Sequence, residues 1–145
     1  MTPRSIILAF FVIIISVIDA KTLKIPNYLL FLCLFLLFAF DIWNFTDFRF
    51  LFGNIITAFI WFFIFYLVYR RSEGIGFGDV KYAALLGYAL GLEKSCAAFL
   101  CTAVAAMAVY SIGIGVFRWS TSAKLPFAPF LGFGILALEC VWRAV

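Results

Sequence analysis

The sequence predicts an all-α protein of the membrane, a polytopic helix bundle with about six transmembrane helices. Of its 145 residues, 67% are hydrophobic and 12% are charged, whereas soluble domains have roughly 45–50% apolar and 25% charged residues. The mean hydropathy is +1.17. The few charged residues are grouped between long apolar runs. We therefore expect residues 1–145 to form a single membrane-embedded domain in contact with lipid.

The apolar runs define the expected helices in chain order. Residues 5–18 form the first and residues 25–40 the second, with Pro26 in its first turn, where proline is tolerated. Residues 50–69 are twenty residues without a charge, which matches the roughly 20 residues needed to cross a bilayer. The loop expected between the second and third helices contains Asp41, Trp43, Asp47 and Arg49.

Three further helices are expected at residues 79–92, 95–117 and 125–142. The first of these is short, because only eleven uncharged residues lie between Lys81 and Glu93. Unusually short spans beside glycines often mark where a site lies within the membrane. We therefore expect Asp79 and Lys81 to lie at the headgroup level or just below it.

The segment before this short helix combines three glycines with a carboxylate. Gly74, Gly76 and Gly78 alternate with apolar residues, and Asp79 follows at once. An acid placed at the start of an apolar helix is costly in lipid, which favours a functional role. Gly76 and Gly78 would let an extended peptide backbone come close. Asp79 is expected to be the N-cap of the helix, where the helix dipole favours its charged form.

Asp19 has a comparable setting, because it closes the first apolar run. With six spans, alternate loops lie on opposite sides of the membrane, and Asp19 and Asp79 fall on the same side. Seven of the eleven basic residues also fall on that side. The positive-inside rule makes it the cytoplasmic side and places both termini outside. We therefore predict that Asp19 and Asp79 meet and form a catalytic pair.

Two facing carboxylates can share a proton, because both cannot ionise when they are close together. One then acts as a base toward water and the other as an acid toward a peptide carbonyl. This chemistry uses no histidine, and the chain has none, which excludes Ser-His and Cys-His nucleophiles. The four cysteines lie inside apolar runs without CxxC spacing, so no metal and no cofactor are expected. Nucleic-acid binding is not expected either, since basic residues occur only in short loops.

The residue types alone leave three other interpretations open. Asp19 and Asp79 could be helix caps at the membrane interface that never meet and pair instead with Lys21, Lys24 or Lys81. The two acids could also form the proton relay of a small transporter. A third alternative is a catalytically silent assembly subunit.

Three motifs in order along the chain favour the catalytic pair over these alternatives. Gly76-Phe77-Gly78-Asp79 is a GxGD motif, which Lys81 extends to GxGDxK. Upstream, Asp19 is followed by basic residues and by Ile25-Pro26-Asn27, and downstream residues 126–130 read PFAPF. Together they resemble the type IV prepilin peptidases, which are intramembrane aspartic proteases related to the archaeal preflagellin peptidases. The resemblance extends from Asp19 to about Gly134.

The resemblance implies an aspartic endopeptidase with Asp19 and Asp79 as the catalytic pair. Gly76 and Gly78 would let the substrate backbone approach, and Lys81 would be a further motif residue at the substrate site, either orienting Asp79 or reaching the interface. The implied partners are type IV prepilin-like or pseudopilin precursors. Their short basic leader, which ends in a glycine and precedes an apolar helix, would be removed at the cytoplasmic face of the inner membrane. Assembly into a homo-oligomer is left open.

The remaining motif residues are expected to be structural. Pro126 and Pro129 would shape the start of the last span. Asn27 could cap the second span or touch the site, and the cap is the favoured interpretation. Glu139 lies four residues before Arg143, a spacing that suits an ion pair on a helix. Bifunctional family members carry a cytoplasmic methyltransferase domain, often with CxxC zinc motifs. Because the polar loops here are only a few residues long, we expect cleavage without N-methylation.

Overall fold

The computed structural model describes residues 3–44, 47–71, 75–115, 128–132 and 134–135. Four helices follow one another in this part of the chain: α1 (Pro3–Thr22), α2 (Asn27–Trp43), α3 (Phe48–Arg71) and α4 (Phe77–Gly115). Residues 128–132 are also helical, and the described residues contain no strand. The predicted all-α fold class is therefore confirmed.

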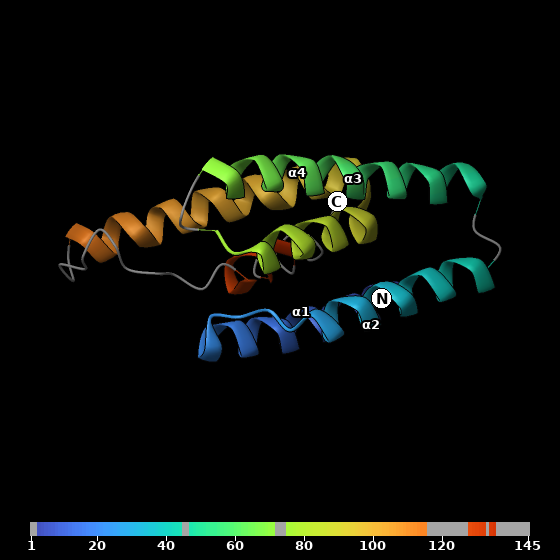
Figure 1. Cartoon of the computed structure of the whole chain (residues 1–145), viewed down its shortest axis with the longest axis horizontal. Helices are drawn as coiled ribbons and strands as arrows, with labels where there is room; N and C mark the ends of the chain where they lie inside the picture. The colour runs from blue at the N-terminus through green and yellow to red at the C-terminus, as the bar shows by residue number, and fades with distance from the viewer. Residues whose placement is uncertain (1–2, 45–46, 72–74, 116–127, 133, 136–145) are drawn as a thin grey trace, which may run out of the picture.

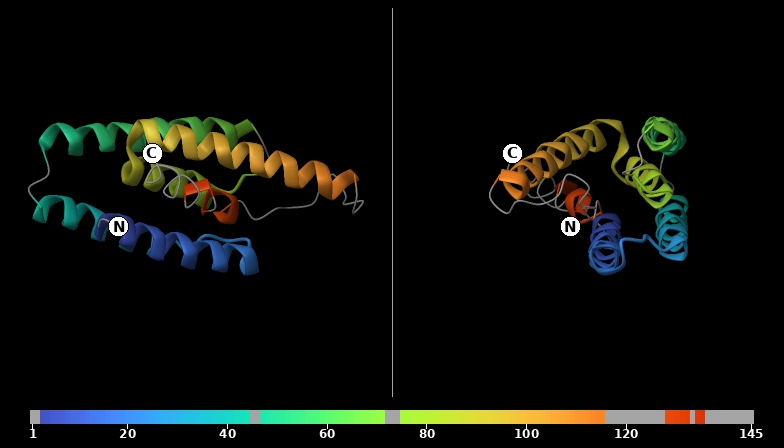
Figure 2. Two further views of the ribbon diagram at one scale, coloured as in Figure 1. Left: turned by 180° about the vertical axis from the view of Figure 1, so that it is seen from behind. Right: turned by 60° about the vertical axis from the view of Figure 1, so that its left-hand side comes forward.

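The helices run back and forth along a common direction and form an elongated bundle (Figures 1 and 2). α1 and α2 form an antiparallel pair, and α3 packs mainly against α4. The end of α1, the start of α2 and the start of α4 lie toward the same end of the bundle (Figure 1). This arrangement brings residues far apart in sequence to one place.

Helix α4 consists of two halves that meet at Gly91, whose φ of 74° and ψ of 176° are not helical. The chain reverses its direction there, so the two halves lie antiparallel (Figures 1 and 2). Glycine suits this position because a positive φ is strained for residues with a Cβ. The predicted boundary at Glu93-Lys94 was therefore wrong by a few residues, since both lie inside the second half of α4.

Helices α1 and α3 are long and apolar enough to cross a membrane, and so is Phe77–Ile112 of α4 when its two halves are counted together. Helix α2 is a shorter apolar helix. The chain is thus a membrane helix bundle, whereas the predicted number of six spans stays a prediction. Most of the expected sixth span, residues 125–142, lies outside the described residues.

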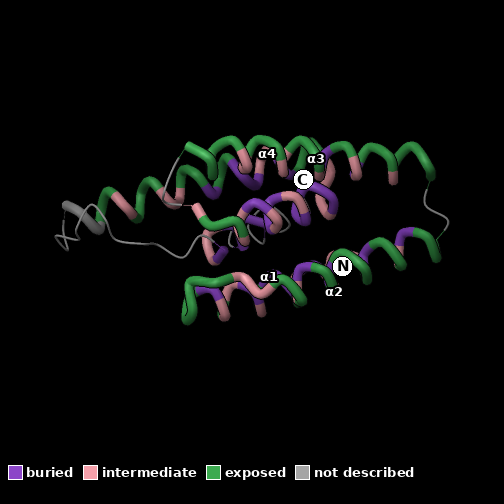
Figure 3. Tube along the Cα trace, viewed as in Figure 1, coloured by how far each residue is buried: buried purple, intermediate pink, exposed green. Residues whose placement is uncertain are grey.

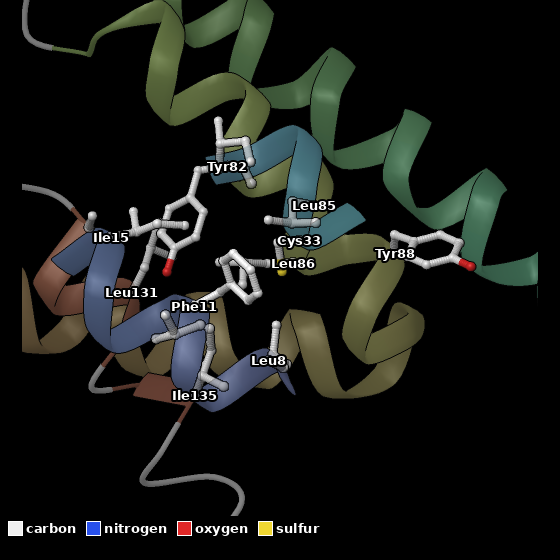
Figure 4. Packing of buried hydrophobic residues seen from close by; sticks show 14 of the residues in the cluster. Leu8, Phe11, Ile15, Cys33, Tyr82, Leu85, Leu86, Tyr88, Leu131 and Ile135 are labelled. Carbon is white, nitrogen blue, oxygen red and sulfur yellow. The ribbon is translucent and has the colours of Figure 1, made fainter. Parts of the chain in front are cut away.

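The first half of α4 is the centre of the core (Figure 3). Tyr82 and Leu86 are fully buried there, and they pack against Phe11 and Ile15 of α1 (Figure 4). Helix α3 has the opposite pattern, because its buried residues are the polar Asn54 and Thr57 while most of its large apolar side chains are exposed. Apolar side chains that face outward suit a helix whose outer face contacts lipid.

A buried polar cluster joins four helices away from Asp19 and Asp79. The Arg4 guanidinium lies 3.3 Å from Asp41 Oδ2, and the Tyr88 hydroxyl donates to the same oxygen at 2.8 Å. Arg4 also donates to the Tyr88 carbonyl at 3.2 Å and lies 5.0 Å from the ring centre of Phe50. The prediction that Asp41 belongs to a loop was wrong, because it is a buried residue of α2.

The close packing of α3 on α4 depends on Gly87. A Cβ there would lie 2.8 Å from Trp61 Cδ1 and 3.1 Å from the Thr57 carbonyl oxygen. Trp61 cannot move aside freely, since its indole N–H donates to Ser95 Oγ at 2.8 Å. A Cβ at Gly53 would meet nothing within 4 Å. These two glycines of neighbouring helices therefore make a matched pair for a stability test.

We expect Gly87→Ala to lower the free energy of unfolding by about 1–3 kcal/mol, the usual effect of overpacking. Gly53→Ala should be neutral or stabilising by up to about 1 kcal/mol, because alanine favours helix over glycine. Unfolding of both variants in mixed detergent micelles measures the difference. Equal effects of the two substitutions would contradict the packing described for Gly87.

Candidate active site

Asp19 lies in the last turn of α1 and is 4% exposed. The helix ends just after it, where Leu23 has a φ of 52° and its N–H donates to the Asp19 carbonyl at 2.8 Å. The left-handed conformation at Leu23 turns the chain toward α2, and it is uncommon for a residue with a side chain. Asp19 is therefore a buried acid at a sharply terminated helix end.

The Asp19 carboxylate is bound by the segment that begins the predicted sixth span. The buried Ala128 N–H donates to Asp19 Oδ2 at 3.1 Å. One turn earlier on α1, the Ser16 hydroxyl donates to the Ala128 carbonyl at 3.2 Å. Pro129 follows Ala128 within the helical residues 128–132. Neither Ala128 nor Ser16 was singled out from the sequence, and the one available signal was that Ala128 lies inside the proline motif of residues 126–130.

The packing of this segment explains two glycines that had no predicted role. A Cβ at Gly132 would lie 2.7 Å from Ser16 Oγ on α1, and a Cβ at Gly134 would lie 2.5 Å from Thr102 Oγ1 on α4. Small residues let membrane helices approach closely. The segment is thus wedged between α1 and the second half of α4, and this position places the Ala128 N–H at Asp19.

Asp79 is the third residue of α4, not its N-cap as predicted, because the helix begins at Phe77. The Gly76 N–H donates to Asp79 Oδ2 at 2.9 Å, and the Asp79 N–H donates to the Gly76 carbonyl at 3.0 Å. Asp79 thus forms half of a capping box: its carboxylate, three residues after the N-cap residue Gly76, accepts the backbone N–H of that residue. The negative charge near a helix N-terminus is still favourable, as the prediction assumed.

The two acids come from separate helices, at the end of α1 and the start of α4, and these lie toward the same end of the bundle (Figure 1). Each receives one backbone N–H at the start of a helical segment: Gly76 for Asp79 and Ala128 for Asp19. The fold therefore brings the two residues that the sequence singled out to one end of the bundle. Their role as a catalytic pair stays a prediction.

The other predicted site residues are placed around Asp79. A Cβ at Gly78 would lie 3.1 Å from Ile25 Cβ, so this glycine lets the α1–α2 connection approach α4. A Cβ at Gly76 would lie 3.4 Å from Asp79 Oδ2, an ordinary contact distance. Gly74 lies outside the described residues, as do Pro126 and Glu139.

Lys81 connects α4 to α2. Its ammonium donates to Asn27 Oδ1 at 3.0 Å and lies 4.8 Å from the ring centre of Phe77. The interpretation of Asn27 as a helix cap was wrong, because the N-cap of α2 is Pro26, with no side-chain cap bond. Asn27 is instead the first residue of α2 and holds the Lys81 side chain on the side of α4 that faces α2.

Tyr82 is a residue near the site that sequence reasoning missed. It is fully buried, and its hydroxyl points toward α1 (Figure 4), where no hydrogen-bond partner for it lies among the described residues. Its position three residues after Asp79, on the same helix face, was the available signal. Within the described ranges, no group of three or more His, Cys, Asp or Glu residues could hold a metal ion.

Comparison with known proteins gives the family. Residues 6–112 match the model of the type IV leader peptidase family. A prepilin leader peptidase/N-methyltransferase of Pectobacterium carotovorum subsp. carotovorum is 27% identical over 134 residues, which is 90% of this chain and 48% of that protein. A protein of the same name from Burkholderia pseudomallei strain 1026b is 43% identical over 65 residues, which is 45% of this chain and 21% of that protein.

The chain thus spans between a fifth and a half of the length of these curated relatives. No solved structure matches it significantly. The family model covers well over half of the chain and includes both Asp19 and Asp79. The chain therefore belongs to the type IV leader peptidase family.

Proposed function

We propose that this protein is a membrane aspartic endopeptidase that removes the short basic leader from type IV prepilin-like or pseudopilin precursors. The observation that supports it most is the location of Asp19 and Asp79. They come from separate helices, lie at the same end of the bundle and are each held by a backbone N–H. Family membership supports a peptidase that processes type IV leaders.

The proposed reaction uses the pair in two protonation states. One aspartate, ionised, takes a proton from a water, and that water attacks the carbonyl carbon of the scissile peptide bond. The other aspartate, protonated, gives its proton to the carbonyl oxygen. Return of one proton to the amide nitrogen breaks the C–N bond, and it releases the leader as an acid and the mature chain as an amine.

The hydrogen bonds suggest which oxygens take part. Both backbone donors bind Oδ2, that of Asp19 and that of Asp79. We propose that Oδ1 of each carboxylate faces the attacking water, because Oδ1 takes no part in the two backbone hydrogen bonds. Gly76, next to Asp79, is the glycine we place alongside the substrate backbone, whereas the space beside Gly78 is already occupied by Ile25. Lys81 would act by holding the start of α4 against α2 through Asn27.

We further propose that the site faces the cytoplasm from the inner membrane. The basic residues support this orientation, since seven of eleven fall on the predicted cytoplasmic side. Reporter fusions after Lys24 and after Arg71 should read as cytoplasmic, and fusions near Trp43 and after Lys94 as external. An external reading after Arg71 would place the site on the wrong side and contradict the proposal.

The direct test is co-expression with candidate prepilin and pseudopilin precursors. We expect a decrease in precursor size on gels, and N-terminal sequencing should show the loss of the leader. Cleavage should persist in chelators and thiol reagents, because the proposed reaction uses neither a metal nor a cysteine. If all precursors kept their leaders while reconstituted protein carried protons across vesicles, the proton-relay alternative would replace the peptidase.

A further inference from the structure

An apolar groove runs along the bundle from the candidate active site. α2 forms one wall between Asn27 and Phe38, α3 forms the other between Ile55 and Phe59, and the first half of α4 forms the floor between Lys81 and Tyr88. Its volume is about 680 Å³. The groove exists because α3 packs mainly against α4 among the described residues, so its side toward α2 is left open.

The groove is continuous with the site at one end. Lys81 lines it and lies two residues after Asp79, and its partner Asn27 also lines it. From Asn27 the α2 wall extends eleven residues, or about 16 Å at 1.5 Å per residue, toward the membrane interior. A chain lying in the groove would therefore leave it at the start of α4, the end of the bundle at which Asp19 and Asp79 lie (Figure 1).

The groove opens toward lipid. Phe35 on one wall is 59% exposed and Phe59 on the other is 70% exposed. Between its ends the lining is aliphatic and aromatic, and the polar groups are at the ends: Lys81 with Asn27, and the Tyr88 hydroxyl. A segment surrounded by lipid must satisfy its own backbone hydrogen bonds, which an α-helix does. The fitting occupant is therefore a single apolar helix.

We propose that this groove holds the apolar helix of the precursor next to its scissile bond, an inference that rests on the proposed function. The helix enters sideways from the lipid between α2 and α3. Its end at Lys81 passes into an extended stretch beside Gly76, where a peptide bond can reach Asp19 and Asp79. Aromatic side chains on both walls supply the packing contacts that drive helix association in membranes.

Site-specific photo-crosslinking tests this placement without requiring cleavage. A photoreactive phenylalanine analogue replaces Phe35 in the groove in one protein and Phe10 on the outer face of α1 in another, both in the Asp79→Asn background. The two positions are matched in exposure, at 59% and 60%. We expect the probe at Phe35 to crosslink to the apolar segment of a bound prepilin at several times the yield of the probe at Phe10. Equal yields, or crosslinks at Phe35 to lipid alone, would overturn the proposal.

A substitution that fills the groove tests the proposal a second time, through the rate of precursor processing. Ala84 lies on the groove floor, whereas Ala103 is exposed on the second half of α4. Ala84→Phe should slow precursor processing by about 10²-fold, the size of effect that a misplaced substrate produces. Ala103→Phe should process at the wild-type rate. Wild-type processing by a folded Ala84→Phe protein would contradict the groove, and if that variant does not fold, the crosslinking result decides.

Failure of the groove and failure of the proposed function give different results. If wild-type protein processes the precursor and Phe35 gives no selective crosslink, the peptidase stands and the groove is excluded as the binding site. If the wild-type protein processes no precursor and Phe35 gives no selective crosslink, both proposals fail together. A selective crosslink without processing by the wild-type protein would support the groove and remove the peptidase.

Discussion

Replacing Asp79 or Asp19 with asparagine is expected to abolish precursor cleavage while the protein stays folded and inserted. Asparagine has nearly the shape of aspartate, but its amide cannot take up or release a proton in the pH range in which a carboxyl group titrates. Its amide oxygen can still accept the N–H of Gly76 at position 79, or of Ala128 at position 19, so the local structure should persist. General acid–base groups typically contribute about 10²–10⁴-fold to the rate, and we expect a loss of at least this size.

The double variant should be no slower than either single one, because residues that act as a unit give non-additive losses. Asp47→Asn is the matched control, since Asp47 is exposed just before α3, and it should retain the wild-type rate. Gel assays of precursor size with purified proteins in micelles measure all four. A purified Asp19→Asn protein that processed a prepilin at the wild-type rate would exclude the paired-aspartate mechanism.

The second large effect is on stability and comes from the polar cluster of Arg4, Asp41 and Tyr88. The Asp41 side chain is 3% exposed, and it binds both the Arg4 guanidinium and the Tyr88 hydroxyl. Asp41→Ala would leave a buried cation and a hydroxyl without this partner. Breaking a buried ion pair from one side costs about 3–5 kcal/mol, and we expect a loss of this size in the free energy of unfolding.

Denaturation in mixed detergent micelles can measure this loss. Asp47→Ala is the control and should cost only about 1 kcal/mol, the usual loss at the residue before a helix, since Asp47 accepts the first backbone bonds of α3. The double variant Arg4→Met/Asp41→Leu should recover most of the loss, because apolar replacement of a whole buried pair is often neutral. If Asp41→Ala and Asp47→Ala unfolded alike, the cluster would not hold the four helices together.

The fold class could be predicted from the sequence, and the two acids could be singled out as candidate site residues, because both inferences depend on local signals. Apolar runs of membrane length predict helices, and an acid such as Asp79 next to Gly76 and Gly78 stands out within an apolar chain. The same signals could not distinguish a charge in a loop from a charge inside the bundle. Asp41 was therefore misplaced, since its partners Arg4 and Tyr88 lie on other helices.

The helix boundaries were predicted less well than the fold class, for a physical reason. The reversal in α4 depends on the positive φ of Gly91, whereas the nearby pair Glu93-Lys94 is the more visible signal in the sequence. Likewise, contacts such as Lys81 with Asn27 and Asp19 with Ala128 join residues far apart in the chain. Such contacts depend on helix packing, which a pattern of hydrophobicity does not specify.

The bond from Ala128 to Asp19 also sets a time at which the site can be completed. The two residues are 109 positions apart, and a ribosome needs about 5–20 s to make a stretch of that length. During this interval Asp19 is already synthesised, but its carboxylate lacks the hydrogen bond from the Ala128 N–H. A newborn chain therefore enters the bilayer with an unfinished site, and it gains the full arrangement only after the segment that begins at Ala128 docks between α1 and α4.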